Sequence, residues 1–193
     1  YLKDHVAVNL LETAEGLKGV NFPDLVTLAL GTLIRDKENN KIKNIRGLVG
    51  LNFKNLEILN FVSIHTNPES NKIDRIEALA DVSFSELREI LLGDNQIENI
   101  EPLEKCFFPG LKYLNLRTIP PNHRRKQNKK HQTAESRQLP FAVQAALDNN
   151  QLNSIDILTE VKFPHLMYLY LSDNAISDLW PLGRVNFPEY NGC

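Results

Sequence analysis

A repeated arrangement of leucine and asparagine restricts most strongly what this chain can fold into. Residues 166–182 follow the pattern Leu-x-x-Leu-x-Leu-x-x-Asn-x-Ile-x-x-Leu-x-x-Leu, and residues 87–103 follow it with isoleucine at some leucine positions. Residues 111–116 begin a further copy, and residues 150–158 form the second half of another. Alternate apolar residues point to the same side of a strand, and steps of three suit a helical or 3-10 turn. Each copy therefore predicts one short strand followed by a return segment.

The pattern resembles that of the leucine-rich-repeat family over nearly the whole chain, apart from one interruption. The resemblance implies an α/β fold: a curved leucine-rich-repeat solenoid with parallel strands on its concave face and loop, 3-10 or short helical returns. We expect a single domain over 1–193 with about six repeats, counting a weak one in residues 6–20. The missing initiator methionine and a new copy that starts at 187–190 predict a chain that is incomplete at both ends.

Most strand segments are followed by an asparagine, for which we expect a structural role. Its amide side chain is short enough to hydrogen-bond the backbone where the chain leaves the strand. Stacked asparagines would then form a ladder that supplies partners to buried peptide groups. The candidates are Asn40, Asn71, Asn95, Asn150 and Asn174.

The repeats differ in length. Their first leucines are Leu25, Leu56, Leu87 and Leu111. The steps between them are 31, 31 and 24 residues, and the two longer copies carry seven additional residues between the strand and the asparagine. These residues fall in polar stretches at 32–39 and 63–70. We expect them to be neighbouring surface loops, because lengthening a loop costs little free energy.

The copies are interrupted between residues 117 and 138, where positive charge is concentrated. This segment has seven basic residues and one acidic residue, so its formal charge is +6 while the remaining chain carries −8. Its densest part contains Arg124, Arg125, Lys126, Lys129 and Lys130. Two interpretations of its place in the fold stay open, an insertion within one repeat or one decayed repeat. For its role, a solvated flexible loop is favoured over a nuclear-localisation signal, a clamp for an acidic partner or a nucleic-acid contact. A nucleic-acid contact is the least favoured, because no aromatic residue interleaves the basic ones to stack on bases.

The side chains that flank the strand leucines are the candidates for binding. Because side chains alternate along a strand, these residues face away from the core, on the concave side of the solenoid. The predicted partner-binding residues are Ile58, Asn60, Val62, Glu89, Leu91, Tyr113, Asn115, Arg117, Tyr168 and Tyr170. The same rule puts Thr27, Ala29, Gly31, Gly93 and Ser172 on this side. Aromatic residues and arginine are common binding anchors, so we expect a protein–protein interaction module whose partner is another protein.

Two other functions remain as alternatives. The first is binding of a polyanion or nucleic acid through residues 117–138, which would make affinity depend on salt. The second is a recognition domain of an enzyme whose catalytic part lies outside this chain. The chain contains no GxSxG, HExxH, GxxxxGK(S/T) or CxxC motif, and its histidines are scattered. We therefore expect it to be no enzyme and to hold no cofactor and no metal.

Net charge, apolar runs, glycosylation sequences and cysteines indicate the cellular environment of the protein. A formal net charge of −2 and the lack of a long apolar run predict no interaction with a membrane. The absence of any Asn-x-Ser/Thr sequence favours the cytoplasm, with the nucleus as the alternative. Of the two cysteines, Cys106 stands among apolar residues and is predicted to be a buried thiol.

Overall fold

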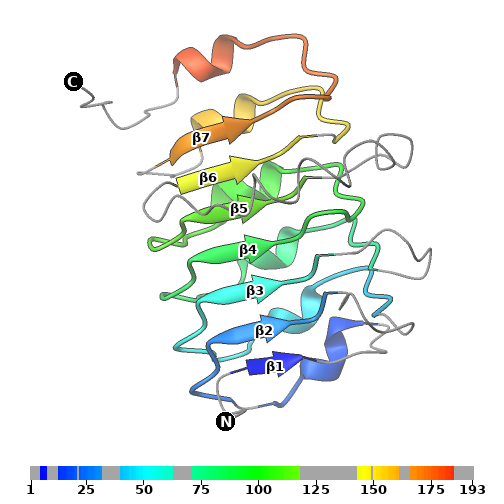
Figure 1. Ribbon diagram of the computed structural model, residues 1–193, viewed down its shortest axis with the longest axis vertical. Coiled ribbons are helices and arrows are strands. Elements are labelled where there is room, and N and C mark those ends of the chain that lie inside the picture. Colours follow the sequence, from blue (N-terminus) through cyan, green and yellow to red (C-terminus); the bar gives the residue numbers. More distant parts are fainter. Residues whose placement is uncertain are drawn as a thin grey trace, which may run out of the picture.

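The computed structural model describes residues 5–7, 13–20, 22–31, 40–62, 71–117, 143–148, 150–160 and 166–184. These residues form coils that stack in chain order along one axis (Figure 1). One parallel sheet contains the strands β1 (His5–Ala7), β2 (Thr27–Ala29), β3 (Ile58–Asn60), β4 (Glu89–Leu91), β5 (Tyr113–Asn115), β6 (Val143–Ala146) and β7 (Leu166–Tyr170), in that order. The described chain is therefore the α/β leucine-rich-repeat solenoid that the sequence predicts.

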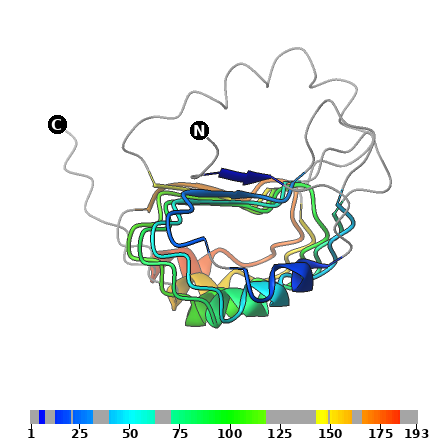
Figure 2. The same cartoon turned by 90° about the horizontal axis from the view of Figure 1, so that it is seen from below.

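In the described residues, the returns on the other side of the coils contain 3-10 helices, which are one of the three predicted forms. In the described residues they are η1 (Ala14–Leu17), η2 (Arg46–Leu48), η3 (Glu77–Ala80), η4 (Glu101–Lys105), η5 (Asp156–Thr159) and η6 (Trp180–Gly183). Seen along the stack, the strands form one layer and the helices the opposite layer (Figure 2). The core lies between them, because the middle residue of each strand points inward: Leu28, Leu59, Ile90 and Leu114 are neighbours in register and are buried.

Strand β6 decides how the basic interruption relates to the repeats. It pairs with β5 and β7, and Ala145 is in register with Leu114, 31 residues earlier. Leu28 and Leu59 are separated by the same number of residues. In the sequence the interruption falls between β5 and β6, and β6 belongs to a separate, degenerate repeat in which alanine replaces the strand leucine. In the described residues the sheet has seven strands, one more than the predicted number of repeats.

The predicted asparagine ladder is present. Asn71 Nδ2 donates to the carbonyl oxygens of Leu30 and Phe61, and its Oδ1 accepts the N–H of Ile42 from the preceding coil. Asn95 repeats these contacts one coil later, with its Oδ1 accepting the N–H of Ile73 at 3.0 Å. Asn40, Asn150 and Asn174 donate to strand-end carbonyls in the same way. Four of these asparagines thus join their own coil to the preceding one, namely Asn71, Asn95, Asn150 and Asn174.

Aromatic and glycine residues complete the packing between coils. Phe53 and Phe84 occupy equivalent places before β3 and β4, and their rings stack with centroids 6.1 Å apart. Gly47 in η2 lies so close to η1 that a Cβ atom placed on it would be 1.8 Å from the carbonyl oxygen of Ala14. The return layer therefore relies on the absence of a side chain at position 47.

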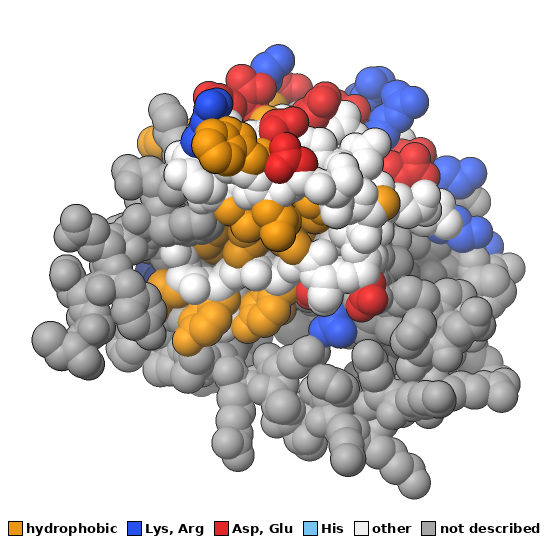
Figure 3. All heavy atoms as spheres, turned by 90° about the horizontal axis from the view of Figure 1, so that it is seen from above, with side chains coloured by type: hydrophobic (Ala, Val, Ile, Leu, Met, Phe, Trp, Pro, Cys, Tyr) orange, Lys and Arg blue, Asp and Glu red, His pale blue; other side chains and the backbone are white. Residues whose placement is uncertain are grey.

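The coil that contains β7 is less completely buried than the internal coils. Figure 3 looks down on this end of the stack and shows apolar side chains gathered in its centre. The residues of this coil that pack against the core are only partly buried, namely Leu169, Leu171, Ile176 and Leu182. Among the described residues, no helix is both long and apolar enough to cross a membrane. The polar stretches 32–39 and 63–70 lie outside the described residues.

Candidate functional site

The outward side of strands β2 to β7, called the strand face below, carries two rows of side chains in register. The first row consists of Thr27, Ile58, Glu89, Tyr113, Gln144 and Tyr168. The second row consists of Ala29, Asn60, Leu91, Asn115, Ala146 and Tyr170. All of the predicted binding residues on these strands therefore share one surface. Their role in binding stays a prediction.

Two tyrosines dominate the end of the strand face at β7. The rings of Tyr168 and Tyr170 stack on each other, with centroids 6.4 Å apart and planes inclined by 10°. Tyr168 is 37% exposed and Tyr170 is 45% exposed. Their neighbours on β6 are Gln144 and the small Ala146, so little side-chain bulk stands beside the second ring. A stacked, accessible aromatic pair of this kind offers a large and rigid contact area.

The middle of the strand face is mixed in character. Asn60 and Asn115 use their Oδ1 atoms locally, accepting the N–H groups of Val62 at 2.9 Å and Arg117 at 3.0 Å. These asparagines thus stabilise the ends of their own strands, and Leu91 lies between them as a half-buried apolar residue.

Glu89 is the acidic residue in the middle of the strand face. Its neighbours in register are Ile58 and Tyr113, and its side chain is half-buried. Loss of contact with solvent raises the pKa of this carboxyl group above its usual value of 4.5. Within the described part of the chain, Glu89 forms no ion pair or hydrogen bond through its carboxylate.

The third outward position departs from the prediction after β2 and β4 only, since Val62 and Arg117 are partly exposed there and Ser172 is exposed. Gly31 and Gly93 are buried, because Val62 and Asn115 of the next coil lie against them. A Cβ atom at Gly31 would be 2.5 Å from the carbonyl oxygen of Val62. These glycines allow close approach between coils and present no side chain to a partner, so assigning them to the accessible face was wrong.

Strand β6, which the sequence left open as part of a decayed repeat, also contributes to this surface. Asp148 is buried, and its Oδ1 accepts hydrogen bonds from the N–H and the hydroxyl of Ser172, the latter at 2.6 Å. Gln144 and Ala146 complete the two rows. The available signal was the three-residue step from Leu147 to Asn150, which matches the step from Leu171 to Asn174. Alanines at the strand positions concealed it.

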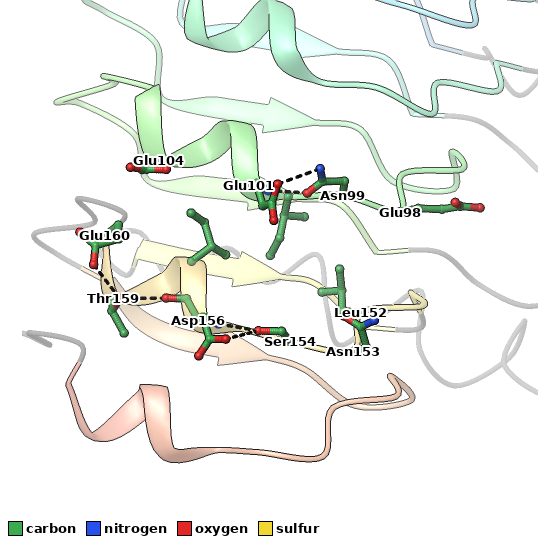
Figure 4. A pocket seen from close by; sticks show the side chains of 12 residues that line it. Glu98, Asn99, Glu101, Glu104, Leu152, Asn153, Ser154, Asp156, Thr159 and Glu160 are labelled. Atoms are coloured by element: carbon green, nitrogen blue, oxygen red, sulfur yellow. Dashed lines mark hydrogen bonds between the residues drawn. The ribbon is translucent and has the colours of Figure 1, made fainter.

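A second candidate site lies on the helical side of the solenoid. A hollow of about 520 Å³ opens between η4 and η5 (Figure 4). The acidic residues that line it are Glu98, Glu101, Glu104, Asp156 and Glu160. Three of them accept local hydrogen bonds. Asn99 Nδ2 donates to Glu101 Oε2 at 3.3 Å, Ser154 Oγ donates to Asp156 Oδ2 at 2.8 Å, and Thr159 Oγ1 donates to Glu160 Oε1 at 3.0 Å. Asn99 and Ser154 also accept the backbone N–H groups of Glu101 and Asp156 at the starts of η4 and η5, so local structure accounts for part of the acidic character.

Cys106 is only partly buried, at the edge of the core, so the prediction of a buried thiol was too strong. Burial and, to a smaller extent, the charge of Asp81 raise the pKa of this thiol to about 12, so it is protonated at neutral pH. The described residues contain no cluster of histidine, cysteine and carboxylate side chains able to hold a metal ion. The basic residues 124–130 lie outside the described residues.

The chain is similar to solved structures of known proteins but matches no known sequence family. No family model matches the chain, and no curated protein matches it. Internalin C2 of Listeria monocytogenes is 22% identical, with 93% of this chain and 76% of that chain covered and a TM-score of 0.43. The internalin InlF of the same species is 23% identical, with 86% of this chain covered and a TM-score of 0.39. The chain spans 46% of the length of InlF. The fold assignment rests on the strand order and the asparagine ladder described above.

Proposed function

We propose that this chain binds another protein through the strand face. The observation that carries the proposal is the stacked pair Tyr168 and Tyr170, which remains exposed although each ring alternates with a core leucine. Aromatic side chains of this kind lose little conformational entropy on binding and are frequent anchors of protein interfaces. Ile58 and Leu91 extend the apolar area toward the middle of the sheet.

The helical side supports this function less well. The hollow between η4 and η5 is lined by charged groups, some of which already serve as local hydrogen-bond acceptors. Exposed charges of this type add little affinity, although they influence association rates. A partner that binds the strand face should therefore be insensitive to neutralisation of Glu98 and Glu104.

Replacing Tyr168 and Tyr170 together with alanine should weaken partner binding about thirtyfold while leaving the fold intact. Both side chains point away from the core, and truncation of anchoring tyrosines costs about 2 kcal/mol of binding free energy. The partner is captured with the full-length protein as bait, and its affinity for the purified wild-type and variant chains is then measured by calorimetry.

Two matched variants separate the competing surfaces. Glu98→Gln combined with Glu104→Gln removes two charges from the helical side, and neutralisation of Arg124 and Arg125 tests the basic segment. Both should bind like the wild type. If the tyrosine double variant keeps its affinity and either control variant loses it, the interface does not lie on the strand face.

A further inference from the structure

Glu89 is a half-buried ionisable residue whose carboxylate forms no ion pair or hydrogen bond with other described residues. It lies between Ile58 and Tyr113 in the first row, and Leu91 projects from the same strand and the same side. A carboxylate that is half-removed from water without a partner raises the free energy of the folded state. Asp148, the acidic residue that follows β6, has partners for its carboxylate, because Ser172 donates two hydrogen bonds to it.

Arg88, the basic residue next to Glu89 in the sequence, does not form an ion pair with it. Arg88 Nε lies 3.8 Å from Glu57 Oε2, on the preceding strand segment, and thus pairs with a different carboxylate. Elsewhere in the described residues, no lysine or arginine forms an ion pair with Glu89. The charge of Glu89 is therefore available to a group supplied from outside the described chain.

We propose that Glu89 receives an arginine side chain of the partner protein. This inference rests on the proposed function and names the chemistry of one contact within it. A guanidinium group pairs with a carboxylate through two parallel hydrogen bonds, and its aliphatic stem packs on apolar surface. Ile58 and Leu91 provide that surface beside the carboxylate. The arrangement fits an arginine better than an isolated cation, because carboxylate and apolar area adjoin.

The contact can be tested without knowing the partner. The probe is N-acetyl-arginine amide, and its matched neutral control is N-acetyl-citrulline amide, which has nearly the same shape. Carboxyl carbon signals of the full-length protein are recorded by NMR during pH titrations at constant ionic strength, and Glu89→Gln identifies the signal of Glu89. A ligand that binds only the ionised carboxylate, at about three times its Kd, lowers the measured pKa of Glu89 by about 0.6.

The expected result is a lower pKa of Glu89 with the arginine probe and no change with the citrulline probe. The carboxyl signals of Glu98 and Glu104, on the helical side, report on unspecific contacts. An equal response to both probes, or an equal response of all three carboxyls, would overturn the inference.

A second measurement separates this inference from the proposed function. In partner binding, Glu89→Gln should reduce affinity about tenfold, whereas Glu98→Gln should have no effect. Unchanged affinity in Glu89→Gln with a strong loss in the tyrosine double variant would reject the arginine contact and keep the strand face. Unchanged affinity in both would reject the proposed function as well.

Discussion

Replacing Asn95 with alanine should lower the free energy of unfolding by about 3 kcal/mol. The side chain of Asn95 is buried, and its Nδ2 donates to the carbonyl oxygens of Phe61 and Leu92 at 3.1 and 2.8 Å. Its Oδ1 accepts the N–H of Ile73. Alanine would leave these buried peptide groups without their partner. The loss is measured by urea denaturation. An unchanged m-value would show that the variant differs in stability and not in the compactness of the folded or unfolded state.

Two other asparagines provide a graded control for this result. Asn174 makes similar contacts in the last described coil but is only partly buried, so Asn174→Ala should cost about 1 kcal/mol. Asn153 is exposed and forms no hydrogen bond through its side chain in the described structure, so Asn153→Ala should change stability by less than about 0.5 kcal/mol. A loss at Asn153 equal to that at Asn95 would show that the ladder is not what stabilises the coils.

Replacing Gly47 with alanine should cost about 3 kcal/mol, although only one methyl group is added. The new Cβ would lie 1.8 Å from the carbonyl oxygen of Ala14 and 2.5 Å from the backbone nitrogen of Glu15. Backbone atoms cannot rotate away as a long side chain can, so η1 and η2 would have to separate. Thermal unfolding of the two proteins would show the loss as a lower Tm.

Gly183 supplies the matched control for Gly47. It also lies in a 3-10 helix, η6, but no atom is within 4 Å of a Cβ placed on it. Gly183→Ala should therefore be neutral or slightly stabilising, because alanine loses less backbone entropy on folding. If both substitutions destabilise the protein equally, the cause is not the contact between η1 and η2.

Much of the fold could be predicted because its signals are local. Alternation at Leu169 and Leu171 indicates a strand, and the three-residue steps after Asn174 indicate a tight return; both depend only on residues close in the chain. The ladder follows from the same spacing. At β6 the sequence left an insertion and a decayed repeat as alternatives, because Ala145 occupies the place of a leucine and a small residue carries no clear periodic signal.

The candidate site was predicted less completely than the fold. Strand alternation placed Tyr168 and Tyr170 outside the core, and the structure confirms this position. Alternation could not show that Gly31 and Gly93 are covered, since the covering atoms belong to the next coil. It also could not show that Arg88 pairs with Glu57, so that Glu89 forms no ion pair with another described residue.

The repeated pattern was sufficient to predict the parallel solenoid, the inward face of each strand and the asparagines of the ladder, because a repeated local pattern imposes the same geometry on every coil. The tertiary structure alone decided that Ala145 joins the sheet, that Gly47 must lack a side chain, and that Glu89 lies half-buried between Ile58 and Tyr113. These properties depend on atoms of adjacent coils, 24 to 33 residues away in the chain, whose contacts a pattern within one repeat does not encode.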